Sequence, residues 1–177
     1  TQWSASGLAA VWAEENTRES IFNAFRRKET FATTGTRIAV RFFGGYNLSS
    51  IDLNSESLVS QAYQKGVTMG SDLLHNENKI PEFLVWAQRD KNGAPLQRIQ
   101  IIKGWIDNNS GRPKEKVYDV ACSDGMQPDP TTNRCPDNGA RVNINDCSIT
   151  SNVGSSELKT VWKDPEFAPD DKTFYYV

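Results

Sequence analysis

The segment RESIFNAFRRKETFATTGTRIAVRFFGG, residues 18–45, begins with a helical pattern and ends with an extended one. Its first part places Ile21, Phe22 and Phe25 on one face of a helix and closes with three consecutive cations, which suit the negative end of the helix dipole. After a Thr-rich hinge, residues 37–43 place Ile38, Val40 and Phe42 on one side, as a strand does. The sequence therefore predicts a change of architecture near residue 36.

Upstream of the helix, residues 7–13 (GLAAVWA) form a nearly continuous apolar run. Such a run predicts a strand buried on both faces, as in a parallel sheet. Asn16, followed three residues later by Glu19, predicts a capping box at the start of the helix. A strand, a short turn and a helix make half of a βαβ unit, which cannot bury both faces without neighbouring units. We therefore expect residues 1–35 to be the last piece of a larger domain.

Downstream of residue 36 the pattern is mainly that of strands, with one short helix expected over residues 55–65. Asn92-Gly93 marks a hairpin turn between two strand-like runs, so we expect a three-stranded antiparallel meander that continues to Cys122. Five stretches have the composition of strands: 82–90, 96–107, 115–122, 157–162 and 173–177. Short strands with turns between them predict that residues 36–177 form a mainly β domain, an antiparallel β-sandwich.

The composition limits the class of protein. With 37% hydrophobic, 10% aromatic and 24% charged residues, the chain is typical of a globular protein with one substantial core. A net charge of -2 gives no general attraction to nucleic acid, so we expect no nucleic-acid partner. The sequence also contains no apolar run long enough for a membrane span.

Three cysteines, Cys122, Cys135 and Cys147, lie in one polar stretch of the chain. They lack CxxC spacing, and the chain has a single histidine, so a zinc site is disfavoured. A loop over residues 122–147 that is held by a disulfide in an oxidising compartment is the better interpretation. Because three is an odd number, one thiol is either free or has a partner beyond Val177.

The same loop also contains several carboxylates. Their oxygen atoms are ligands of the kind that calcium prefers, although the spacing does not follow an EF-hand pattern. Calcium in the stretch from Asp124 to Asp146 therefore stands as an alternative to a plain disulfide loop. The aspartates concerned are Asp124, Asp129, Asp137 and Asp146.

Long motifs spread over nearly the whole chain resemble a known family. These motifs are GLAAVWAEENTRESIFNAFRRKETFATTGTRIAVRFFGGY, AYQKGVTMGSDL, FLVWAQRDKNGAPLQRIQIIKGW, EKVYDVACSDG, RCPDNGA and FYYV. In them the chain resembles the C-terminal part of the DUF3604 family, whose members resemble the PHP (polymerase and histidinol phosphatase) superfamily of metal-dependent phosphoesterases.

The resemblance implies a distorted β/α barrel upstream, with a His- and Asp-rich site for divalent metal ions. Residues 1–35 would then be the last βα unit of a barrel that is truncated in this chain, and its partner would be the remainder of the barrel or a second chain. The resemblance further implies a periplasmic or secreted protein, a small phosphoester substrate, and another cysteine beyond the FYYV strand.

The resemblance also places Glu15 and Arg18 at the catalytic face, because β/α barrels carry their chemistry in the loops after the strands. Arg18 would bind a substrate oxyanion, and Glu15 would orient a metal-bound water or a metal ligand. The alternative is that Arg18 merely pairs with Glu14 on the surface. His75 lies in a polar turn and is expected to be a solvated loop residue, so no metal ligand is assigned to this chain.

Two functions follow from these observations. In the first, the chain is the C-terminal part of an exported metal-dependent phosphoester hydrolase, which is catalytically incomplete without the upstream metal ligands. In the second, the β domain is a non-catalytic module that binds or builds an envelope or extracellular assembly.

Overall fold

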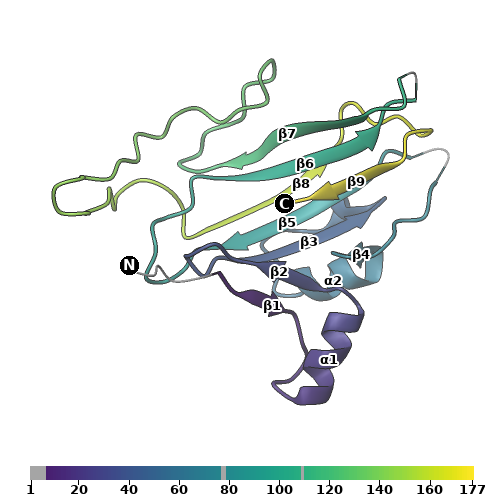
Figure 1. Ribbon diagram of the computed structural model, residues 1–177, viewed down its shortest axis with the longest axis horizontal. Helices are drawn as coiled ribbons and strands as arrows, with labels where there is room; N and C mark the ends of the chain where they lie inside the picture. The colour runs from purple at the N-terminus through teal and green to yellow at the C-terminus, as the bar shows by residue number, and fades with distance from the viewer. Residues whose placement is uncertain (1–6, 77–78, 109) are drawn as a thin grey trace.

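The computed structural model describes residues 7–76, 79–108 and 110–177. Two antiparallel sheets face each other and form the body of the molecule (Figure 1). Sheet I has the strand order β4 (Gly66–Thr68), β3 (Ala39–Gly45), β5 (Glu82–Gln88) and β8 (Glu157–Lys163). Sheet II has the order β7 (Pro113–Cys122), β6 (Arg98–Ile106) and β9 (Thr173–Tyr176).

The main core lies between these sheets. Because side chains alternate along a strand, Phe83, Val85 and Ala87 of β5 point inward and meet Ile99 and Ile101 of β6. The same cluster includes Phe42, Leu96, Tyr118, Val120 and Leu158. Both sheets therefore share one apolar core, as two packed layers require.

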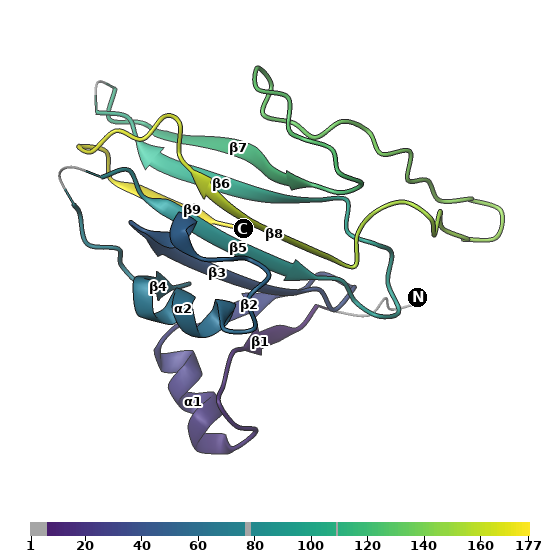
Figure 2. The same ribbon diagram turned by 180° about the vertical axis from the view of Figure 1, so that it is seen from behind.

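The outer face of sheet I has a cover of its own. Phe43 and Leu84 point away from the main core and pack against a short helix, α2 (Leu58–Lys65), and a 3-10 turn, η1 (Leu48–Ser50). Leu58 and Ala62 are the buried residues of α2. The result is a second, smaller core on the opposite side of sheet I. Figure 2 shows α2 on this side of the strands.

Several predicted elements are confirmed. The protein is mainly β, and its sheets are antiparallel. The helix expected over 55–65 begins at Leu58 and ends where the N–H of Gly66 donates to the carbonyl of Ala62. The two expected closing strands are β8 and β9, and each occupies an edge of a different sheet.

The predicted three-stranded meander is wrong. The turn at Asn92-Gly93 does form, with the N–H of Gly93 donating to the carbonyl of Asp90 (3.0 Å). However, the chain crosses from sheet I to sheet II after this turn, so β5 and β6 do not pair. The physical reason is that β5 and β6 are both apolar on one face, and the two faces meet across the core.

The prediction for residues 7–13 is also wrong. The strand β1 (Ala9–Val11) is short and pairs antiparallel with β2 (Thr30–Ala32), and Ala9 is exposed. Between them stands α1 (Arg18–Arg26), which projects away from both sheets (Figure 1). The described residues contain no closed barrel. The domain boundary at residue 35 stays a prediction.

The predicted capping box of α1 does not form either. The N-cap is Thr17, whose hydroxyl oxygen accepts a hydrogen bond from the N–H of Ser20 (3.3 Å), and not Asn16. Thr17 takes this position because its backbone is extended, as an N-cap requires. Glu19 consequently lies in the first turn of the helix.

Candidate functional site

Glu15 and Arg18 flank the start of α1. Both are exposed, and neither side chain has a hydrogen bond or ion pair within the part of the chain that the structure describes. The alternative surface pair between Arg18 and Glu14 is not formed. Two opposite charges are therefore available at this helix terminus for groups outside the described chain.

The two phenylalanine side chains of α1 are also largely exposed. Phe22 is 58% exposed and Phe25 is 50% exposed, whereas Ala24 is the buried residue of the helix. Ile21, which shares this helical face, is half-buried. Exposed aromatic side chains on one helix are typical of an interaction surface. Their predicted contact with further barrel polypeptide stays a prediction.

A polar junction fixes the β1–α1–β2 unit to the body. The guanidinium of Arg41 lies 3.7 Å from the ring centre of Trp12 and donates to the hydroxyl of Tyr63 (3.3 Å). That hydroxyl donates to the carboxylate of Glu29, which is buried and also pairs with Arg27. Burial raises the pKa of Tyr63, and its bond to the Glu29 carboxylate raises it further. The unit is therefore tied to β3 and α2.

An open groove of about 750 Å³ lies between β3 and β9. Val40, Phe42 and Gly44 line it from sheet I, and Tyr175 lines it from sheet II. Its polar lining comes from short segments that reach the groove from several parts of the chain: Lys28, Asp72, His75 and Asp171. This volume falls within the range of typical ligand sites, about 300–1,000 Å³. The groove is therefore large enough for a ligand or a short peptide segment.

Near the groove, a buried ion pair joins Lys103 in β6 of sheet II to Asp164, which directly follows β8 of sheet I. Nζ of Lys103 lies 2.6 Å from Oδ2 of Asp164, and it also donates to the carbonyl of Glu166 (2.7 Å). The hydroxyl of Tyr175 donates to the same Asp164 oxygen (2.7 Å). Burial raises the pKa of Tyr175, and the neighbouring Asp164 carboxylate raises it further. These contacts hold β9 in place.

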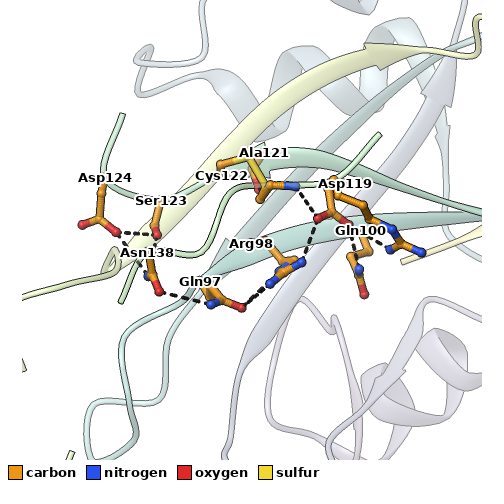
Figure 3. The surroundings of a disulfide bond; sticks show 11 residues. Gln97, Arg98, Gln100, Asp119, Ala121, Cys122, Ser123, Asp124 and Asn138 are labelled. Carbon is orange, nitrogen blue, oxygen red and sulfur yellow. Dashed lines mark hydrogen bonds and ion pairs between the residues drawn. A yellow bond between two sulfur atoms is a disulfide. The ribbon is translucent and has the colours of Figure 1, made fainter. Parts of the chain in front are cut away.

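The predicted disulfide loop is confirmed. Cys122 and Cys135 form a disulfide, and Cys147 is a free, exposed cysteine. Figure 3 shows the polar network next to this bond. Its centre is the buried carboxylate of Asp119, which accepts hydrogen bonds from Arg98 (2.9 Å) and from the backbone N–H of Cys135 (2.7 Å).

The carboxylates proposed for calcium do not converge. Each accepts hydrogen bonds from its own neighbourhood, as Asp129 does from the N–H groups of Thr131 and Thr132. Within residues 7–76, 79–108 and 110–177, no three His, Cys, Asp or Glu side chains gather as a metal site would require. Calcium at the Asp124 to Asp146 loop stays a prediction, which thermal unfolding in CaCl₂ and in EDTA would check.

The same finding applies to the divalent metal ions of a phosphoesterase. His75, the single histidine, is exposed at the groove and is not part of a ligand cluster. The donor groups of the described residues therefore do not fit such a metal centre, and the divalent metal ions stay a prediction.

Sequence reasoning missed the groove and the ion pair beside it. Lys103 and Asp164 are far apart in the chain, and no single motif contains both. The only available indication was a lysine inside the otherwise apolar run IQIIKGW. A charge in such a run requires a buried partner, but the sequence does not say which carboxylate provides it.

Comparisons with known proteins agree with the motifs. A family model described as a protein of unknown function, DUF3604, matches residues 1–177. Searches of curated proteins and of solved structures gave no match. In the described ranges, no helix combines the length and apolar character that crossing a membrane requires. Since the family model matches from the first residue to the last, this chain belongs to the DUF3604 family.

Proposed function

We propose that this chain is the C-terminal part of an exported, metal-dependent phosphoester hydrolase of the PHP type. The observation that carries the proposal is the surface of α1. Phe22 and Phe25 are exposed on the helix, and the unpaired charges of Glu15 and Arg18 lie at its N-terminal end. An apolar patch beside available charges suits docking against a domain whose active site lies at the same edge.

In this proposal the chain contributes binding and orientation. The guanidinium of Arg18 would bind the oxygen atoms of a phosphoester, because its planar donors match that group. Glu15 would accept a hydrogen bond from a metal ligand of the neighbouring domain and so orient it. The metal ions would supply the activated water, and their ligands would lie in that domain.

The disulfide between Cys122 and Cys135 supports the exported location. Disulfides form and persist in oxidising compartments such as the periplasm and the extracellular space. We therefore propose a periplasmic or secreted protein that acts on small phosphoesters.

The test uses the polypeptide that contains this chain together with its upstream domain. It would be purified with Mn²⁺ or Zn²⁺ and assayed with bis(p-nitrophenyl) phosphate. We expect Arg18→Ala to lower kcat/KM by about 100-fold, as loss of a charged hydrogen bond to a transition state does. Arg112→Ala, an exposed arginine between β6 and β7, is the matched control. Absence of hydrolysis, or equal effects of the two variants, would contradict the proposal.

A second candidate function is a non-catalytic module that binds a partner in an envelope or extracellular assembly. The observation that favours it is the groove between β3 and β9, which is independent of α1. Metal analysis separates the two candidates. A parent protein that contains stoichiometric transition metal supports the hydrolase, whereas a metal-free parent that does not hydrolyse phosphoesters supports the module.

A further inference from the structure

We infer that the groove is a receptor for one extended strand of another polypeptide, which adds to sheet II beside β9. The inference does not depend on the hydrolase proposal. It rests on the position of the groove between the sheets, on the backbone groups at the edge of β9, and on the side chains that hold this edge.

At the groove, sheet I extends further than sheet II. The ring of Tyr175 in β9 is 4.3 Å from the ring of Phe83 in β5, so β9 faces the middle of sheet I. The next strand of sheet I is β3, and its inward residues Val40, Phe42 and Gly44 line the groove. The described part of sheet II has no strand beyond β9, so the groove occupies the position of one.

The edge of β9 offers backbone hydrogen bonds to such a strand. The N–H of Ile106 donates to the carbonyl of Lys172 (3.4 Å), and Trp105 pairs with Thr173 in the register. In an antiparallel ladder, pairs of opposed residues that hydrogen-bond to each other alternate with pairs that do not. Ile106 and Lys172 form a bonded pair, so Thr173 and, two residues later, Tyr175 belong to non-bonded pairs. Their backbone N–H and C=O groups therefore point away from β6. These groups have no backbone partner within the described residues.

This edge is held in place before any strand arrives. The hydroxyl of Tyr175 donates to Asp164, which is itself paired with the buried Lys103. The ring of Tyr175 packs on Phe83 at the same time. A preformed edge lowers the entropic cost of binding, because the receptor loses little freedom.

These features define the chemistry of the occupant. It is an extended peptide whose main chain pairs with Thr173 and Tyr175 and whose side chains alternate. Every second side chain would be apolar and would contact Val40 and Phe42, and the others would face solvent. Two other occupants are distinguished by the test below. An amphiphile would fill the groove without bonding to the backbone groups of β9, and a second copy of the chain would pair through its own β9.

The test uses the full chain and a fluorescein-labelled peptide of about seven residues that alternates valine and threonine. A peptide with N-methyl groups on alternate amides is the control probe, because it cannot complete the ladder. We expect fluorescence anisotropy to show binding of the first peptide only. Thr173→Pro removes an N–H that faces the groove, at an edge where proline is tolerated, and should weaken binding by at least about tenfold.

Thr173→Val is the matched control, because it keeps the N–H and loses only the hydroxyl. It should bind the peptide within about twofold of the unchanged chain. Gly44→Leu gives a second variant that places a side chain in the groove and leaves β9 intact. A Cβ at Gly44 would lie 3.5 Å from the Phe83 ring and 3.7 Å from the Leu73 side chain, both ordinary contacts. The rest of the leucine would extend into the groove that Gly44 lines, so we expect the variant to fold and to bind more weakly. If Thr173→Pro does not fold, the peptide affinity of Gly44→Leu tests the inference instead.

Several outcomes would overturn the inference. Equal binding of the two probes would show that the backbone edge is not used, and the occupant would then be an amphiphile. Sedimentation velocity that shows a dimer which Thr173→Pro dissociates would assign the groove to a second copy. No binding at a probe concentration of about 1 mM, a very weak limit for a specific site, would also reject it.

Discussion

Nζ of Lys103 lies 2.6 Å from Oδ2 of Asp164, and the two side chains are only 2% and 0% exposed. Taking both charges out of water has a large cost, which their attraction offsets only when further hydrogen bonds are made. Here the carbonyl of Glu166 and the hydroxyl of Tyr175 supply those bonds. The pair therefore joins β6, β9 and the turn after β8.

Removal of the lysine should be costly. Lys103→Met leaves the Asp164 carboxylate buried without its cation, and we expect the free energy of unfolding to fall by about 3–5 kcal/mol. Lys116→Met is the matched control, because Lys116 pairs with Glu166 at the surface, and it should cost less than about 1 kcal/mol. Urea unfolding measures both. Similar losses for the two variants would contradict the buried role.

The Asp119 network predicts a sensitivity to acid. Burial alone would raise the pKa of Asp119, but the N–H of Cys135 and the side chains of Gln100 and Arg98 together lower it below its ordinary 3.8. A carboxyl whose pKa is lowered by folding stabilises the protein above the ordinary pKa, and this contribution disappears as the pH falls through the folded value.

We therefore expect the unfolding free energy to decline below about pH 4, and Asp119→Asn to decline less steeply in that range. Urea unfolding measured between pH 7 and the acid limit of solubility, about pH 2, gives both slopes. Asp72→Asn, at an exposed position, is the control and should keep the original slope. Parallel curves for Asp119→Asn and the unchanged protein would show that Asp119 is not the group responsible.

The cysteines allow a direct count of thiols. In the native protein we expect one thiol, that of Cys147, to react with Ellman's reagent, and three after reduction in denaturant. Replacing both Cys122 and Cys135 by alanine opens a loop whose ends are 13 residues apart, and should cost about 3 kcal/mol. Cys147→Ser should change stability by less than about 0.5 kcal/mol. Three reactive thiols in the native protein would refute the pairing.

The junction of the N-terminal unit should respond to a single hydroxyl. Tyr63→Phe removes the donor to the buried Glu29 carboxylate, which we expect to cost about 1–3 kcal/mol. Hydrogen exchange of the β2 amides should become faster, because Glu29 directly precedes that strand. Tyr46→Phe removes a hydroxyl bonded to the carbonyl of Leu74 in an exposed loop, so its β2 amides should exchange at the original rate. Unchanged exchange in Tyr63→Phe would contradict the role of this contact.

Local sequence patterns identified most of the strands but not their partners, and they missed β2 and β4. The alternation in β3 and the stretches that form β5 to β9 followed from residues within each strand. Asn92-Gly93 correctly marked a reversal, yet a turn motif does not say whether the next strand pairs beside the last one or crosses the core. The apolar run at residues 7–13 predicted a strand buried on both faces. Its strand β1 instead pairs with β2 in a small antiparallel unit and is partly exposed.

Candidate sites whose residues lie close together in the sequence could be predicted, whereas sites formed by distant segments could not. The Cys122–Cys135 pair lies within one loop, and composition pointed to it. Glu15 and Arg18 lie at the start of α1, and their catalytic role stays a prediction. The groove and the Lys103–Asp164 pair depend on segments that meet only in the folded state, so no short motif contains them.

The edge positions of β8 and β9 have a consequence for biosynthesis. Each of these late strands completes a different sheet, and the side chains of Leu158 and Tyr175 contribute to the shared core. Sheet I therefore cannot be completed before β8 has left the ribosomal exit tunnel, nor sheet II before β9 has left it. Pairings between distant segments are slow to form, so the nascent chain must keep its unfinished apolar faces soluble until synthesis has passed β9.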